Sequence, residues 1–294
     1  MPMREPVRLP EAEWKARKSR HLLRLAPVVE PHVARQSRHE KHPVHDFIFR
    51  YYGFRAAWLM RWGPGAGVVL EGEPAREFLQ YEHYESCDGG VRLKPLVLNP
   101  ERRASAEWIL NLLETTAARA PRFGCFGLHE WAMVYRAPER RHAGTSLRMD
   151  DDALADFVDS QRICCSHFDA FRFFTPAARP LNTLQPTRAC IPELEQRGCL
   201  HANMDLYKWA IKFWPWIPSE LIAEAFLLAV EIRELDMRAS PYDLRDYGYT
   251  PVCIETDAGR AEYQRHQSAL AERAQPIRLQ LIESYRELLS FGDA

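Results

Sequence analysis

The sequence predicts a mainly α-helical protein, a single-domain and bundle-like helical globule with a few short strands. Three observations support this fold class. Long segments carry apolar residues at helical spacing, strand signals are few and short, and no Pro-, Gly- or Ser-rich stretch marks a flexible domain boundary. The chain has 294 residues, 46% of them hydrophobic, which is enough to bury a large core.

Helical periodicity defines most of the expected elements. We predict helices over 10–40, 101–120, 150–174, 203–214, 219–239 and 256–289. Pro276 is expected to kink or break the last of them. We predict strands at 67–71, 131–135 and 251–255, and a long ordered loop at 175–198. The chain then divides into a basic, exposed N-terminal helical segment (1–40) and a main helical domain (41–294).

Charge and cysteine content suggest partners and a compartment. The net charge is −1, but residues 1–61 hold thirteen Lys or Arg, six Asp or Glu and five His. This basic excess suits contact with phosphate groups, and a solvated surface helix is the alternative explanation. The seven cysteines form no CxxC motif, and no apolar stretch resembles a secretory signal or a membrane span. We therefore expect a cytoplasmic protein with reduced thiols and no membrane association.

Two predicted helices carry a carboxylate on their apolar side. In "CSHFDAFRFF" (165–174), Asp169 lies on that side and His167 lies on its shoulder. Asp236 shares a helix face with small apolar residues. A buried carboxylate needs a cation, N–H donors or a proton. Each is therefore either a functional group or part of a local structural pair, such as Asp169 with Arg172.

The stretch "HPVHDFIFRYYGFR" (42–55) places a histidine and a carboxylate on one helix face. His42 and Asp46 are four residues apart, which suits metal chelation or a histidine–carboxylate hydrogen bond. An ordinary pair between Asp46 and Arg50 is the alternative.

Two further stretches place ionisable side chains among aromatic ones. In "FGLHEWAMVYR" (126–136), His129 and Glu130 point in different directions in either a helix or a strand, so they need not serve one site. In "CLHANMDLYKWA" (199–210), His201 lies just outside a predicted helix N-terminus. Several such helices converging would form a buried polar site.

The chain resembles a bacterial family whose members are often named 3-methyladenine DNA glycosylase. The resemblance is carried by "FGLHEWAMVYR", "CSHFDAFRFFTPAARPLNTLQPTR", "CLHANMDLYKWA" and "RELDMRASPYDL", and it runs nearly end to end from "KHPVHDFIFRYY". It implies a DNA base-excision glycosylase that removes alkylated purines, with a buried carboxylate stabilising an oxocarbenium-like state. No cofactor is then required, and DNA would contact the basic N-terminal third.

Under this hypothesis the site residues fall into two groups. The catalytic candidates are Asp46, Asp169, Asp236, His129 and Glu130. The substrate-binding candidates, several of them aromatic side chains that stack on a flipped base, are Tyr51, Trp131, Tyr135, Phe171, Arg172 and Arg238.

Two other functions remain open. The first is an oxygenase or hydrolase that acts on a small molecule through iron, manganese or zinc, since mixed histidine and carboxylate ligation suits these metals. Its candidate metal ligands are His42, His167, His201 and Asp169, with His129, Asp46, Glu130 and Asp236 as further donors. The second is a non-catalytic binding protein in which the polar groups are structural. The sequence contains no HExxH, GxSxG or P-loop motif that would favour one of the three functions over the others.

Overall fold

The structure, a computed structural model, describes residues 5–138 and 144–291. These residues form twelve α-helices and a small four-stranded sheet, which confirms the predicted mainly α fold. The longer helices are α1 (Glu11–Ser37), α2 (His45–Tyr52), α4 (Pro100–Ala118), α6 (Asp151–Asp159), α11 (Ser219–Arg238) and α12 (Asp257–Phe291). The shorter ones are α3 (Ala56–Leu59), α5 (Leu128–Ala132), α7 (Phe168–Phe171), α8 (Ile191–Leu194), α9 (Leu200–Met204) and α10 (Leu206–Ile211).

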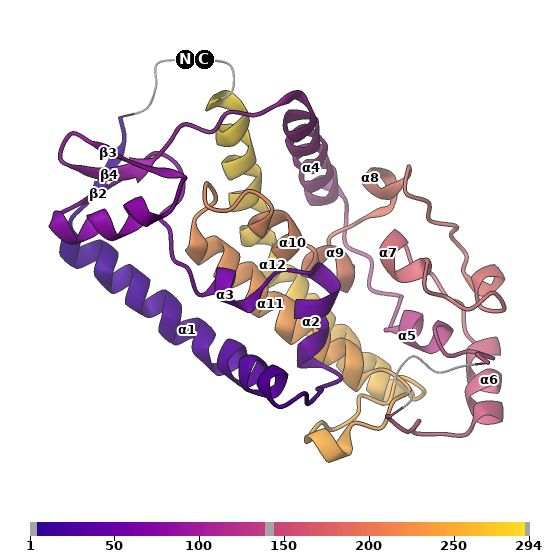
Figure 1. The fold of residues 1–294 in the computed structure, drawn as a ribbon. Coiled ribbons are helices and arrows are strands. Elements are labelled where there is room, and N and C mark those ends of the chain that lie inside the picture. Colours follow the sequence, from indigo (N-terminus) through magenta and orange to yellow (C-terminus); the bar gives the residue numbers. More distant parts are fainter. Residues whose placement is uncertain (1–4, 139–143, 292–294) are drawn as a thin grey trace.

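The sheet lies on the opposite side of the molecule from α5, α6 and α7 (Figure 1). Its strands are β1 (Val7–Leu9), β2 (Val68–Glu71), β3 (Tyr84–Cys87) and β4 (Gly90–Leu93), in the order β1-β2-β4-β3. β1 pairs with β2 in parallel, and the other pairs are antiparallel. Short 3-10 helices span Glu73–Gln80, Arg179–Leu181 and Arg245–Tyr247.

Helix α11 is at the centre of the fold. It packs against α1, α2, α9, α10 and α12 (Figure 1), and most of its side chains are buried. The side chains that are not buried, such as Glu231, lie along one stripe of the helix, and Asp236 lies on the buried side. Asp236 near the C-terminal end of α11 is therefore inside the protein, only 1% exposed, as its predicted apolar face implies.

Helix α1 packs along α11 and buries five of its side chains, including Trp14 and Leu25. Several of its cations pair with acids elsewhere in the chain, as Arg17 does with Glu220. Part of the N-terminal basic excess is thus already neutralised within the molecule. The division at residue 40 stays a prediction.

The predicted helix at 150–174 is wrong in its second half. α6 ends at Asp159, and the chain then runs alongside Asn182 before α7 begins. The Asn182 amide accepts a hydrogen bond from the Cys165 N–H and donates one to the Cys165 carbonyl. These bonds take the place of helical ones, so the helical-wheel argument for Asp169 and His167 does not hold.

The other element predictions are mixed. The helices at 10–40, 101–120 and 219–239 and the strand at 67–71 are confirmed, while 203–214 lies over two helices, α9 and α10. The strands at 131–135 and 251–255 are wrong, because these apolar runs are buried by packing rather than by pairing with a strand. Helix α12 is not broken at Pro276, whose ring is exposed while its neighbours Ile277 and Arg278 are buried.

No helix within the described ranges combines the length and the apolar character that crossing a bilayer requires.

Candidate metal centre

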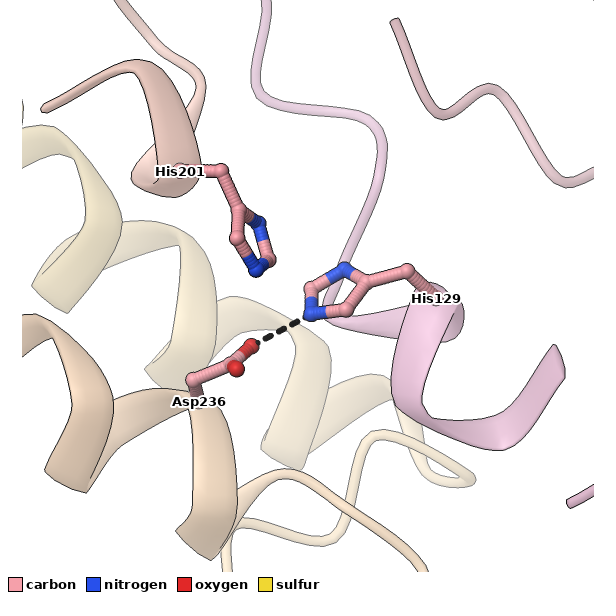
Figure 2. Close-up of side chains that lie close together, drawn as sticks. All are labelled: His129, His201 and Asp236. Carbon is pink, nitrogen blue, oxygen red and sulfur yellow. Dashed lines mark ion pairs between the residues drawn. The ribbon is translucent and has the colours of Figure 1, made fainter. Parts of the chain in front are cut away.

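Three buried side chains from three separate helices meet in the interior. His129 comes from α5, His201 from α9 and Asp236 from α11, and they point toward one another (Figure 2). One potential ligand atom from each lies within 4.8 Å of the others. The residues are 2%, 8% and 1% exposed. In the part of the chain that the structure describes, this is the one group of His, Cys, Asp and Glu side chains that could share a metal ion.

The closest contact in this group is an ion pair, drawn as a dashed line in Figure 2. His129 Nε2 lies 2.7 Å from Asp236 Oδ1, both atoms are buried, and the contact lacks the geometry of a hydrogen bond. A buried polar atom without a partner costs about 1–3 kcal/mol. Two ligands bonded to one metal ion at about 2.1 Å in tetrahedral geometry lie about 3.4 Å apart. His129 Nε2 and Asp236 Oδ1 are closer than this, so they must move slightly apart to bind one ion together.

Helix α5 reaches this position because of its N-terminal glycine. Gly127 has φ +73°, and a Cβ there would lie 3.4 Å from Ala239 and from Tyr263. The glycine thus lets α5 begin close to the end of α11 and to α12. The Trp131 indole N–H donates to the Ala239 carbonyl at 2.9 Å, which fixes the helix there. This docking places His129 over Asp236.

The second oxygen of Asp236 belongs to a buried ion network. Arg233 Nη1 donates to Asp236 Oδ2 at 3.0 Å and to Glu130 Oε1 at 2.6 Å, and its guanidinium lies over the Phe47 ring. His129 and Glu130 are therefore connected to one carboxylate, Asp236, a connection that the sequence left open. Their side chains do diverge, but Arg233 connects Glu130 to the carboxylate that His129 contacts. Such outer contacts orient a metal-binding carboxylate.

The site holds its groups in different protonation states. Burial lowers the pKa of His129, but the Asp236 charge outweighs burial and raises it. Burial raises the pKa of Asp236, but His129 and its other cationic neighbours bring it below its usual range. Burial and the neighbouring His129 charge hold the pKa of His201 well below its ordinary value. His201 is therefore neutral, which is the form of imidazole that binds metals.

A cavity of about 360 Å³ gives access to this group. His129 and His201 line it, together with four cysteines: Cys125, Cys164, Cys165 and Cys199. A volume of this size suits a small molecule. Sequence reasoning missed the cysteines as cavity residues, because they come from separate segments and have no spacing motif.

A second polar cluster lies behind His201. The His167 ring stacks on the His201 ring at 5.2 Å, and His167 Nε2 lies 3.3 Å from Glu195 Oε1 and 3.5 Å from Asp205 Oδ2. Tyr52 donates its hydroxyl to Asp205, and burial raises the pKa of Glu195 to about 7. His167 was a predicted metal ligand, but the structure places it next to a ligand rather than in the group.

Asp46 and His42 lie in a different place. His32 Nδ1 and Arg35 Nη2 each donate to Asp46 Oδ1 at 2.8 Å, which joins α1 to α2. Burial raises the pKa of Asp46, but these two donors outweigh it and lower the pKa to about 2. His42 stacks on His45 and accepts backbone N–H groups through Nδ1. Neither residue belongs to the group of three.

The remaining predicted residues also lie outside the cavity. Asp169 is paired with Arg172 at 2.9 Å, as the local alternative predicted, and with Lys208. The described cavity wall includes none of the substrate-binding candidates, which are Tyr51, Trp131, Tyr135, Phe171, Arg172 and Arg238. Tyr135, for example, donates its hydroxyl to Asp159, and Arg238 donates to the Thr250 carbonyl.

Comparison with known proteins found no family model, no curated protein and no solved structure that matches this chain.

Proposed function

We propose that this protein is a metal-dependent enzyme in which His129, His201 and Asp236 hold one transition-metal ion. The ion activates water or O₂ for a reaction on a small molecule. One observation carries the proposal: the three buried donors converge within 4.8 Å of one another, and two of them, His129 and His201, line a cavity.

The donor set favours iron. Two histidines and one carboxylate with open positions are the ligand set of non-haem iron(II) oxygenases, and related sets hold catalytic zinc. Since His129 and His201 line the cavity, a metal bound to them faces the space that a substrate would occupy. A metal so placed polarises a bound oxygen atom or lowers the pKa of a bound water.

A metal-free ion network is the competing account. The charges of Glu130, Asp236 and Arg233 balance if His129 is protonated. In this account His129 and Asp236 are held by their ion pair at 2.7 Å, which lacks the geometry of a hydrogen bond. The account gives no role to the neutral His201 beside them. A bound metal satisfies all three side chains.

Elemental analysis tests the proposal directly. The purified full chain, incubated with iron(II), manganese(II) or zinc(II) and then desalted, is expected to retain about one ion per chain. His129→Ala, His201→Ala and Asp236→Asn should each lose it, because each removes one of three ligands.

Matched controls come from residues outside the group. His42→Ala and Asp169→Asn remove a histidine and a carboxylate of the same kinds elsewhere, and both should retain the metal. A folded wild-type chain that holds none of the three metals would contradict the proposal.

The DNA glycosylase function implied by the family resemblance stays a prediction. Asp236 is the carboxylate that would act in it, since it contacts His129 at the cavity wall. Release of free base from methylated DNA, abolished in Asp236→Asn, is the result that this function requires. The cytoplasmic location likewise stays a prediction.

A further inference from the structure

The cavity that leads to the metal centre has a basic wall. Arg119, Arg122 and Arg162 line it, whereas Glu193 is the one acidic residue on the wall that the structure describes. A neighbouring hollow shares Arg122 and Arg162 and adds Arg260. The entrance is thus positively charged, although the whole chain has a net charge of −1.

Two of these arginines, Arg122 and Arg162, are exposed. Within the described ranges, no acidic side chain forms an ion pair with Arg122 or Arg162. Arg119, by contrast, donates through Nη1 to the Glu195 carbonyl at 2.7 Å. The guanidinium groups of Arg122 and Arg162 act on the Cys164 thiol, where their charges oppose the rise in pKa that burial causes. Both charges therefore lie near one side chain of the cavity wall.

The backbone beneath Arg122 is held firmly. The Gln196 side chain accepts a hydrogen bond from the Arg122 N–H at 2.8 Å and donates one to its carbonyl at 3.2 Å. Gly198 packs so closely on this backbone that a Cβ would lie 2.5 Å from the Arg122 carbonyl oxygen. Arg197 Nε donates to the Arg119 carbonyl. Segment 119–122 is thus tied to residues 195–198.

The backbone next to Arg162 is also fixed. The Ile163 carbonyl accepts a hydrogen bond from the Thr183 N–H at 2.9 Å, and the Asn182 amide bonds to both backbone groups of Cys165. Two exposed guanidinium groups on fixed backbone, both at one cavity, are suited to binding an oxyanion, because each guanidinium presents several N–H donors in one plane.

We propose that the substrate of the metal centre is a small molecule with a carboxylate or phosphate group, which Arg122 and Arg162 bind at the cavity entrance. The rest of the substrate extends toward His129 and His201. This inference rests on the proposed metal centre, and it adds the chemical class of the substrate.

Calorimetric titration of the metal-loaded full chain tests the inference. The probes are glutarate, inorganic phosphate, the uncharged diamide of glutarate and a short single-stranded oligonucleotide. Glutarate or phosphate should bind, and the stronger of the two identifies the preferred oxyanion. Arg122→Gln and Arg162→Gln should each weaken that binding about tenfold, since each removes a charged hydrogen-bond donor. Arg76→Gln, which changes an exposed arginine on another part of the surface, should not.

Three results would overturn the inference: unchanged affinity in the Arg122→Gln/Arg162→Gln double variant, equal binding of the diamide, or tighter binding of the oligonucleotide than of either small anion. The metal content of the same samples separates the two proposals. A chain that holds its metal but binds no small anion refutes the substrate class alone. A chain that binds the anion through these arginines without holding a metal refutes the metal centre instead.

Discussion

Asp46 and Asp236 are both buried carboxylates, yet their surroundings differ. His32 and Arg35 donate to one oxygen of Asp46, and the His42 N–H donates to the other. Asp236 receives a hydrogen bond from Arg233 on one oxygen, and its other oxygen forms an ion pair with His129 that lacks hydrogen-bond geometry. A carboxylate whose oxygens are all hydrogen-bonded stabilises the fold, whereas Asp236 Oδ1 keeps a hydrogen-bonding position that a ligand could use.

Replacing Glu130 tests whether the ion network supports the metal site. Glu130→Gln removes the charge that fixes Arg233, and Arg233 in turn orients Asp236. We expect the metal affinity to fall about ten- to a hundredfold, as for other outer contacts of metal ligands. Competition with a coloured chelator measures it.

The control for this variant is Glu231→Gln. Glu231 lies on the same helix, α11, and pairs with Arg273 at the surface, so its loss should leave the metal affinity unchanged. If Glu130→Gln binds the metal with wild-type affinity, Arg233 orients Asp236 without the Glu130 contact, which contradicts this prediction.

At the scale of elements, short helices are positioned by their neighbours. α5 and α9 have five residues each, which is too short to be stable alone. α9 packs against α11 and α12, whereas α5 packs against α6 and approaches the end of α11 through Gly127 and Trp131. The position of a ligand residue on such a short helix depends on the contacts that hold the helix in place. For α5 these contacts include the close approach of Gly127 and the Trp131 hydrogen bond.

The junction of α1 and α2 should weaken with acid. Asp46 has a pKa of about 2 in the folded protein, below its ordinary value of 3.8. Its contribution to stability is therefore complete above about pH 4 and is lost as pH falls toward 2. Asp46→Asn should lower the free energy of unfolding by about 3 kcal/mol at pH 7, because it breaks a buried ion pair. Urea unfolding at several pH values measures this.

The stability difference between wild type and Asp46→Asn should itself depend on pH. The difference between wild type and Asp46→Asn should shrink as pH falls from about 4, since the wild-type carboxyl then also loses its charge. Asp169→Asn, which removes a partly exposed pair, should cost less than about 1 kcal/mol. A difference for Asp46→Asn that is constant across this range would contradict the assignment.

At the scale of the whole molecule, the proposed metal joins segments that are far apart in the chain. α5, α9 and α11 each supply one ligand, so an ion bound there stabilises the packing of all three. The unfolded chain does not bring these ligands together, and metal binding therefore favours the folded state.

Metal addition should therefore stabilise the protein in proportion to its binding. At a metal concentration a hundred times the dissociation constant, we expect the free energy of unfolding to rise by about 2.7 kcal/mol. Denaturant titration with and without metal measures this, and a chelator should reverse it. Asp236→Asn should show no rise. An equal rise in that variant would mean that the metal binds elsewhere.

The sequence by itself determined the long helices and the burial of Asp236. Both depend on the periodicity of apolar residues, which is local information: the face of α11 that carries Asp236 can be identified without knowing what covers it. The same reasoning selected His129 and His201 as separate candidates, because each stands among aromatic or apolar neighbours.

Only the tertiary structure decided which candidates meet. Asp46 and Asp169 looked as promising as Asp236 in sequence, but ion partners satisfy both of them. His129 reaches Asp236 because Gly127 lets α5 begin against the end of α11. The Asn182 side chain ends the helical pattern before α7. These contacts join residues far apart in the chain, and periodicity carries no information about such contacts because their energy depends on docking and not on local spacing.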